Sequence, residues 1–448
     1  MIYMKQALKF VPPVIESTQS GSRREVYDRS VELFEQRHYV EALHALLDYF
    51  NPEFRPKYGD AAGLKFRIPH GSIVVDIAVA GDRLDIYADF LKLPEKGRVA
   101  MLRQVVDMNI NRLRLPHFVK QGDKLAIAYS CPLAETHPHK ITGVLSNICS
   151  VGDRYDDEFC TKFGAERCYE PQVTPYPAET VDRIYAELQS LGRAAQEAVK
   201  EYNGQREFRR SWYVLFTFFY QLQYFAAPQG QLANDIDKIY CSMDEEGLFA
   251  ELVNRGSAYL DRLLAMPKEE IARDLYFVDT LVSPKRPSSL RNIQESIEDD
   301  FDAATAALQQ SDYETALLLM TYKLYQVYVF NDMQDDVNAV IVSALRKASE
   351  KAPDVAAEIL WNAMNDIMEG NLVPDIDLAE VIAGNPAAQA AVEQAGARVA
   401  AMQQAMSSDS MQALQQRMME AMTRGDMAEY MRLAGEMQQM VMQGMFNN

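Results

Sequence analysis

The sequence predicts an α+β domain at the N-terminus followed by an all-α helical region. Apolar residues alternate with a period of two in the stretches 64–90 and 113–129, whereas their spacing after residue 177 is helical. Residues 171–177 (PQVTPYP) lie between the segments with these two patterns. Prolines at alternating positions oppose both helix propagation and sheet pairing. We therefore expect an α+β domain over residues 1–170 and a helical bundle domain over 178–370.

The first domain opens with helical periodicity that is interrupted near His38 and Tyr39, which predicts two short helices or one interrupted helix. The period then changes to two over three successive strands. The second strand ends at Gly81-Asp82, a pair suited to a tight hairpin because glycine tolerates positive φ and aspartate often caps its own turn. The predicted strands cover residues 64–68, 73–79 and 84–90.

The rest of this domain is predicted to add a helix, two strands and a closing helix. The helix over 95–111 follows Pro94, a residue that helix starts accept. Two strands surround Gly122-Asp123, and a final helix runs from about 139 to 163. This order predicts an antiparallel sheet covered by helices on one face. The apolar residues that indicate the first of these helices are Val99, Leu102, Val106 and Ile110.

The helical region contains two segments that are apolar or aromatic at nearly every helical angle, 211–225 and 312–330. A helix of this kind must be surrounded by others, so we expect both at the centre of a bundle. The start of the second segment and residues 38–50 resemble the second helix of a tetratricopeptide hairpin. No 34-residue spacing links the two, so the sequence does not support a repeat array. A proline-rich joint at 283–289 divides the region.

Acidic residues are concentrated between residues 290 and 370, where 15 acidic residues face 5 basic ones. Most of them lie in 295–302 (ESIEDDFD) and 331–336 (NDMQDD). Solvated helix ends and loops explain such runs most simply. A docking surface for a basic partner is an alternative, and a divalent-ion site is a weaker one because the EF-hand spacing is absent.

The third predicted segment is a Met/Gln-rich helical tail over residues 371–448. Its part from 387 onward holds 12 of the 22 methionines of the chain. Methionine is unbranched and polarizable, so a face made of it can pack around different apolar partners. These side chains could instead pack on the chain's own bundle or in a homodimer, or remain unpacked. The candidate partner-binding residues here are Met418, Met422, Met427 and Met431, spaced in pairs one helical turn apart.

Composition and charge exclude several classes of partner. The chain has 48% hydrophobic and 24% charged residues, as in ordinary globular proteins, and a formal net charge of −19. Such a charge repels phosphate backbones and anionic bilayers, so we expect neither nucleic acid nor membrane as a partner. No long apolar segment or standard signal is present, and the five cysteines form no CxxC motif. We therefore expect the protein to be located in a bacterial-type cytoplasm.

The sequence contains no recognisable catalytic, cofactor or metal motif. GxGxxG and GxxxxGK[ST] are absent. Cys131, His137 and His139 lie within nine residues of one another, but their spacing to the other cysteines matches no zinc knuckle. No glycine-flanked nucleophile turn supports a cysteine nucleophile with a histidine base. We therefore expect a protein that is not an enzyme and that uses no metal or cofactor.

Residues from about 64 to 163 resemble the YbjN family of small bacterial proteins, whose fold is shared with type III secretion chaperones. The resemblance is carried by SIVVDIAVAGDRLDIYADF, by LPEKGRVAMLRQVVDMNINRLRLPHFV and by KLAIAYSCPL. It implies a non-enzymatic domain, usually dimeric, that binds other proteins, as secretion chaperones hold an extended client segment. This chain departs from both families by carrying some 275 further residues after Pro171.

These observations lead to a hypothesis of function. We expect a chaperone-like or adaptor protein that binds another polypeptide or client segment, with a homodimer as a further possibility. The two expected surfaces are the sheet domain and the methionine-rich tail. On the sheet, the candidate partner-binding residues are Val74, Tyr87 and Leu91. The alternative is an enzyme with a dispersed site that no sequence spacing reveals.

Overall fold

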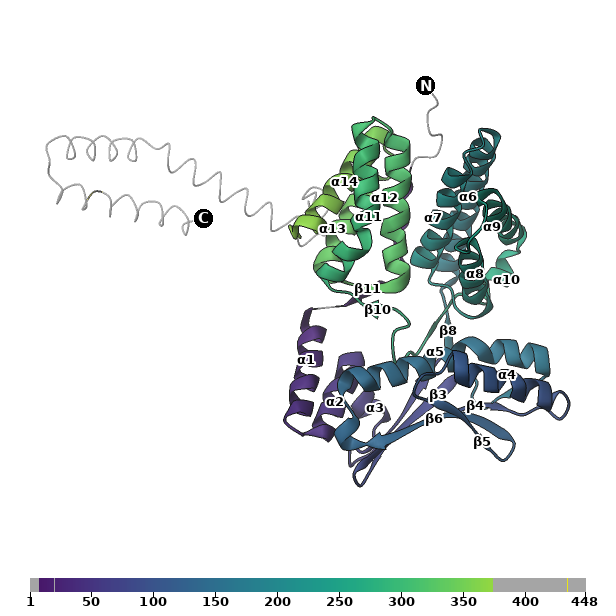
Figure 1. Cartoon of the computed structure of the whole chain (residues 1–448), viewed down its shortest axis with the longest axis vertical. Helices are drawn as coiled ribbons and strands as arrows, with labels where there is room; N and C mark the ends of the chain where they lie inside the picture. Colours follow the sequence, from purple (N-terminus) through teal and green to yellow (C-terminus); the bar gives the residue numbers. More distant parts are fainter. Residues whose placement is uncertain (1–7, 20, 374–432, 434–448) are drawn as a thin grey trace. The chain divides into compact units, whose positions relative to one another are not determined.

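The computed structural model describes residues 8–19, 21–373 and 433 (Figure 1). The described chain contains an N-terminal α+β part followed by a helical part, as the sequence predicts. Each part has its own hydrophobic core. Within the described residues, no helix combines the length and apolar character needed to cross a membrane.

The α+β part contains a five-strand antiparallel path with the order β2-β3-β4-β6-β5, and β7 pairs with the end of β4. Buried side chains of α2, α4 and α5 form one core with the strands. The elements are α1 (Gly21–Glu35), α2 (Tyr39–Phe50), α3 (Phe54–Tyr58), β2 (Lys65–His70), β3 (Ile73–Ala80), β4 (Arg83–Lys92), α4 (Arg98–Asn111), β5 (His117–Gln121), β6 (Lys124–Pro132), the 3-10 helix η1 (Leu133–Glu135), α5 (Pro138–Phe163) and β7 (Glu166–Arg167).

The predicted hairpin between the second and third strands is confirmed. Residues Gly81 and Asp82 form a two-residue turn, with Ala80 paired to Arg83 on either side. Gly81 has a φ of 61°, a left-handed conformation that glycine adopts without steric cost. The turn fixes the register, so Val75, Ile77 and Val79 all point into the core.

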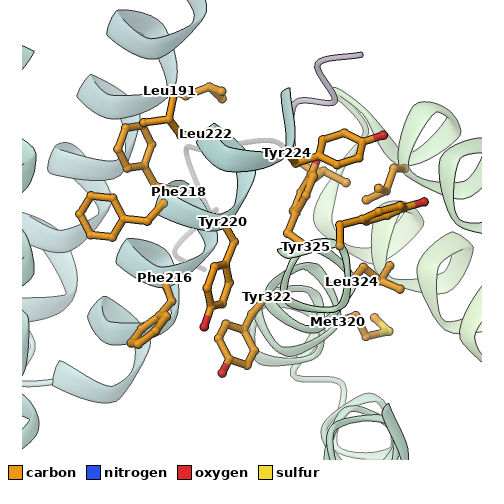
Figure 2. Close-up of a cluster of buried hydrophobic side chains, with 14 of the residues drawn as sticks. Leu191, Phe216, Phe218, Tyr220, Leu222, Tyr224, Met320, Tyr322, Leu324 and Tyr325 are labelled. Carbon is orange, nitrogen blue, oxygen red and sulfur yellow. The ribbon is translucent and has the colours of Figure 1, made fainter. Parts of the chain in front are cut away.

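The helical part centres on α7 and α12, the two segments predicted to be surrounded. Figure 2 shows their aromatic side chains packed together, with Tyr220 beside Tyr322 and Tyr224 beside Tyr325. The elements are β8 (Val173–Pro175), α6 (Ala178–Gly204), α7 (Phe208–Ala226), α8 (Gly230–Met243), α9 (Phe249–Ala265), α10 (Lys268–Ala272), β9 (Tyr276–Val278), β10 (Arg286–Pro287), α11 (Leu290–Gln309), α12 (Tyr313–Phe330), β11 (Asn331–Gln334), α13 (Asp335–Ala348) and α14 (Pro353–Glu369).

Helices α6–α9 and α11–α14 form two equivalent four-helix units, which we call unit A and unit B. In each unit the first helix packs on the second and fourth, and the fourth also packs on the second and third. Helix α13 spans 335–348, which is 105 positions after α8 at 230–243, and α12 begins 105 positions after α7. The buried positions correspond as well. Leu188 and Ile293, and Ile236 and Ile341, are equivalent pairs 105 positions apart. Helix α14 begins 104 positions after α9, and Leu263 is equivalent to Ile367 at this spacing.

The same helix-helix turn occurs in both units and again between α1 and α2. In each case a residue with positive φ precedes the second helix: Arg37 (64°), Arg206 (63°) and Ser311 (58°). The N–H of the following residue donates to the carbonyl five residues earlier, which closes the end of the first helix. The sequence indicated two of these hairpins but not the third, and it did not indicate the 105-residue correspondence.

The segment 8–19, which we call the strap, belongs to the helical core although it precedes the sheet in sequence. Leu8 and Val11 are buried in that core, with 8% and 3% of their surface exposed. The strap ends in β1 (Thr18–Gln19), which pairs in parallel with β11. In the other direction, Leu281 and Val282 leave the helical part to join the core of the sheet. The two parts of the described chain are therefore linked in more than one place.

Candidate protein-binding surfaces

Helix α4 carries an exposed apolar stripe, which is the largest such feature on one helix of the described chain. Val99, Val106 and Ile110 expose 67%, 59% and 75% of their surface. Their spacing of seven and four residues puts them on one face. The opposite face buries Met101, Val105 and Met108 against the sheet.

The apolar residues whose spacing predicted this helix therefore lie on its outer face, with half-buried Leu102 at the edge of that face. The helix is apolar on both sides, and the core is supplied by a second set of residues that the sequence analysis did not single out. Because Met101, Val105 and Met108 already attach α4 to the sheet, the exposed stripe is not needed to hold the helix in place. A large exposed apolar patch that the fold does not use is typical of an interaction site.

Basic residues are frequent in α4 and its flanking segments, in contrast to the acidic character of the whole chain. Between residues 95 and 115 there are five basic residues and two acidic ones, Glu95 and Asp107. Leu115, just beyond the helix, also exposes 51% of its surface. The basic residues are Lys96, Arg98, Arg103, Arg112 and Arg114, all exposed. Such a surface complements a segment that combines apolar side chains with negative charge.

The three candidate residues on the sheet are not brought together on an open surface. Leu91 has no exposed surface, because a β-bulge between Asp89 and Leu91 breaks the alternation and turns Leu91 into the core. Val74 is also buried, with 8% exposed. Neither side chain is available to a partner in this structure. Tyr87 is half-buried on the face of the sheet that points away from the core.

Tyr87 belongs to a polar cluster on that face. Its hydroxyl donates to Asp89 at 2.9 Å and lies 3.1 Å from Gln121 Oε1, while Lys124 forms an ion pair with Asp89 at 3.1 Å. Burial raises the pKa of Tyr87 to about 12, and the hydrogen bond to Asp89 adds to this effect. The hydroxyl therefore stays protonated at neutral pH and is engaged within the sheet.

A polar cleft of about 200 Å³ lies where the sheet part meets the helical part. Asp153, Asp157 and Arg167 line it from the sheet side, and Tyr276 lines it from the helical side. Burial raises the pKa of Asp153 and of Asp157, and neighbouring Asp156 raises both further. The guanidinium of Arg167 pairs with Asp156 at 2.5 Å and also with Asp157.

Cys149 and His70, a thiol and an imidazole that line this cleft, are not poised for catalysis. Burial raises the pKa of Cys149 well above its usual value, so its thiol stays protonated. Burial lowers the pKa of His70 to about 4, and the Nδ1 of His70 accepts a hydrogen bond from the Leu281 N–H at 3.0 Å. Among the described residues, no group of three His, Cys, Asp or Glu side chains could hold a metal ion.

Cys131, His137 and His139 have structural contacts. Cys131 is buried in the core of the sheet. The imidazole rings of His137 and His139 stack with their centroids 5.4 Å apart, and His137 Nδ1 accepts from the backbone N–H of His139. His139 Nδ1 lies 2.7 Å from the Tyr27 hydroxyl. These interactions attach the start of α5 to α1.

The two acidic runs have different places in the fold. Residues 331–336 form β11 and the start of α13, where Asp335 and Asp336 occupy the first helical turn and interact favourably with the helix dipole. In α11, Glu295, Glu298 and Asp299 are exposed to solvent. The solvated interpretation holds for these exposed residues. It does not hold for Asp300, which pairs with Lys323 at 2.8 Å, or for Asp332, whose pKa is raised by burial. The methionines proposed for partner binding, Met418, Met422, Met427 and Met431, lie outside the described residues.

No protein-family model matches the chain, and no curated protein matches it. The functional argument therefore rests on the surfaces described above.

Proposed function

We propose that this protein is a non-enzymatic, cytoplasmic protein-binding protein, chaperone-like or adaptor-like, whose α+β part docks a segment of another polypeptide on α4. The methionine-rich tail is a second proposed surface. The observation that carries the proposal is the exposed stripe of Val99, Val106 and Ile110 on a helix rich in basic residues. The partner segment would present apolar side chains with acidic neighbours.

The energetics support a docking role for this stripe. Fully burying a Val or Ile side chain contributes about 1.5–3 kcal/mol. Covering three side chains of which more than half is exposed would therefore contribute on the order of 4 kcal/mol before the costs of association. That contribution suits a reversible complex, and the basic residues of α4 and its flanking segments would speed the approach of an acidic segment.

A photoreactive residue on α4 tests the proposal. We would place p-benzoylphenylalanine at Val106 in the host cell and, as a matched control, at Ala100, which is exposed on the same helix about 100° around its axis from Val99. The proposal predicts a discrete cross-linked polypeptide from position 106 and a much weaker product from position 100. Equal products from both positions, or none, would contradict it. A product containing only this chain would make the stripe a homodimer interface.

The alternative of a dispersed enzyme site would place it in the polar cleft. The thiol of Cys149 is protonated and the imidazole of His70 accepts from the Leu281 N–H, so neither side chain is an activated nucleophile or a free base. These features favour the binding function. A reaction that is lost on Asp153→Asn and retained on Val106→Asp would favour the enzyme instead.

A further inference from the structure

The strap lies between unit A and unit B and is hydrogen-bonded to both. From unit A, Gln221 Nε2 donates to the Lys9 carbonyl at 2.5 Å, and the Phe225 carbonyl accepts from the Val14 N–H at 3.1 Å. From unit B, the Glu350 N–H donates to the Leu8 carbonyl at 2.7 Å. The main chain of an extended segment is thus held from two sides, as grooves hold bound peptides.

Unit B also binds the middle of the strap. Ser349 Oγ accepts from the Phe10 N–H at 3.0 Å, and the guanidinium of Arg346 lies 5.9 Å from the centroid of the Phe10 ring. Unit A contributes Glu187, which pairs with Lys9. It also contributes Tyr224, labelled in Figure 2, whose ring centroid lies 6.3 Å from that of Phe10.

The side chains of the strap fall into two groups, one buried in the groove and one exposed to solvent. Leu8 and Val11 are buried between the units, while Ile15 and Glu16 are exposed. Pro12 and Pro13 follow Val11 and favour an extended backbone before binding, which lowers the entropy lost on docking. The recognised pattern is an apolar residue, a basic residue, an aromatic residue and then Val-Pro-Pro-Val.

The groove is not completely filled by the strap. A cavity of about 60 Å³ lies beside Leu8 and Lys9, lined by apolar side chains of α6, α7 and α12. The hydroxyl oxygens of Thr217 and Thr321, which also line it, are buried and have no hydrogen-bond partner among the described residues. Buried polar groups are normally paired, so this part of the groove could hold a larger or more polar side chain than Leu8.

We propose that the groove between unit A and unit B is a binding site for an extended, proline-containing segment of another polypeptide, and that the strap occupies it in cis until such a segment displaces it. The segment would have the chemistry of residues 8–14, with an apolar residue before a basic one, an aromatic residue and Val-Pro-Pro. This site is separate from the α4 stripe, and neither proposal depends on the other.

Cleaving the tether tests whether the strap is an exchangeable ligand. A protease site would be introduced at residues 20–22, between the strap and the body of α1, so that cleavage of the folded, full-length protein leaves the strap bound without a covalent link. A fluorescein-labelled peptide of residues 5–19 would then be titrated and followed by anisotropy. Because a tether gives an effective concentration in the millimolar range, we expect at least about 100-fold tighter binding to the cleaved protein than to the intact one.

Two substituted peptides provide the matched control. Val11→Asp puts a charge on a side chain that is 3% exposed, whereas Ile15→Asp puts the same charge on one that is 38% exposed. We expect the first change to weaken binding to the cleaved protein at least about 30-fold and the second less than about 3-fold. Equal losses would overturn the proposed groove.

The state of the cleaved protein distinguishes the remaining outcomes. A strap that neither leaves nor exchanges would overturn the proposal and make the strap a permanent part of the core. Loss of helical circular dichroism once the strap leaves would overturn it in the same way. A cleaved protein that stays monomeric and folded while it exchanges the labelled peptide supports the proposal. Exchange that occurs only between copies of this chain, with formation of dimers, would contradict it and make the occupant a second copy.

Discussion

Arg210 joins the helix-helix turns of unit A and unit B, and its removal should weaken the contact between them. Its guanidinium pairs with Asp312 at 3.1 Å and Glu314 at 3.2 Å in unit B, and with Glu207 at 3.0 Å in unit A. It also donates to Thr315 Oγ1 at 2.9 Å. Arg210→Ala would leave three carboxylates near one another without their shared cation.

The expected loss of stability follows from the exposure of these groups. Hydrogen bonds to charged groups contribute about 1.5–3 kcal/mol each, but exposed ion pairs contribute far less. The side chains of Arg210 and Glu314 are 25% and 21% exposed, whereas that of Asp312 is 40% exposed and is screened by water. We therefore expect Arg210→Ala to destabilise the protein by about 2–3 kcal/mol at neutral pH, or about 3–4 °C in melting temperature.

The pH dependence provides a second test of the same cluster. Burial opposes ionisation of Asp312, but hydrogen bonds from Thr315 and the charge of Arg210 outweigh it and lower the pKa of Asp312. A carboxyl group with a lowered folded-state pKa stabilises the fold above its unfolded pKa, and this contribution is lost as the pH falls through the folded value. The deficit of Arg210→Ala should therefore shrink between pH 7 and pH 3.

Thermal unfolding followed by circular dichroism, with Arg209→Ala as the control, measures this effect. Arg209 is exposed, and its side chain contacts the ring and the hydroxyl of Tyr213. We expect the control to change stability by less than about 0.5 kcal/mol. A melting temperature for Arg210→Ala within about 1 °C of the control at pH 7 would refute the expected contribution of this cluster to stability.

Three further predictions follow from buried positions. His70 has its pKa lowered to about 4 by burial, so the unfolded chain takes up a proton first as the pH falls, and stability should drop by on the order of 3 kcal/mol between pH 6.5 and pH 4. Urea titrations should show that His70→Asn lacks this slope. Gly71→Ala should destabilise by about 1–3 kcal/mol in the same assay, because Gly71 has a φ of 51° and an added Cβ would lie 1.8 Å from Asp153 Oδ1. Ile236→Ala and Ile341→Ala, at equivalent fully buried positions, should each cost about 2–5 kcal/mol, and a cost for only one of them would contradict the equivalence of the units.

Local sequence patterns predicted the elements of the sheet and the two central helices, because alternation, hairpin chemistry and continuous apolar runs act over a few residues. They failed at Leu91, where a single bulge reverses the alternation that placed it on the open face. They also did not reveal which face of α4 is buried. Val106 and Val105 are the same residue type one position apart, and only the contact with the sheet makes one exposed and the other buried.

The equivalence of unit A and unit B was not found from the sequence, because it is mainly a property of packing rather than of residue identity. The buried residue Leu188 corresponds to Ile293, but Gly192 corresponds to Ile297, so the cores are filled by different residue types. One signal was available. The dipeptide Tyr220-Gln221 recurs at Tyr325-Gln326, 105 positions later. The position of the strap was also beyond local reasoning, since its contacts lie more than 170 residues away.

The binding affinity of the polypeptide cross-linked at α4 tests the central proposal most directly. Ile110→Asp would be compared with Ala100→Asp, which adds the same charge to an exposed position outside the stripe. Ile110 is 75% exposed, so losing its burial and desolvating a charge in its place should weaken binding by at least about 30-fold, while melting temperature stays unchanged. The control should bind within about 3-fold of the unmodified protein. Equal affinities for all three proteins, measured by calorimetry, would contradict a binding function for α4.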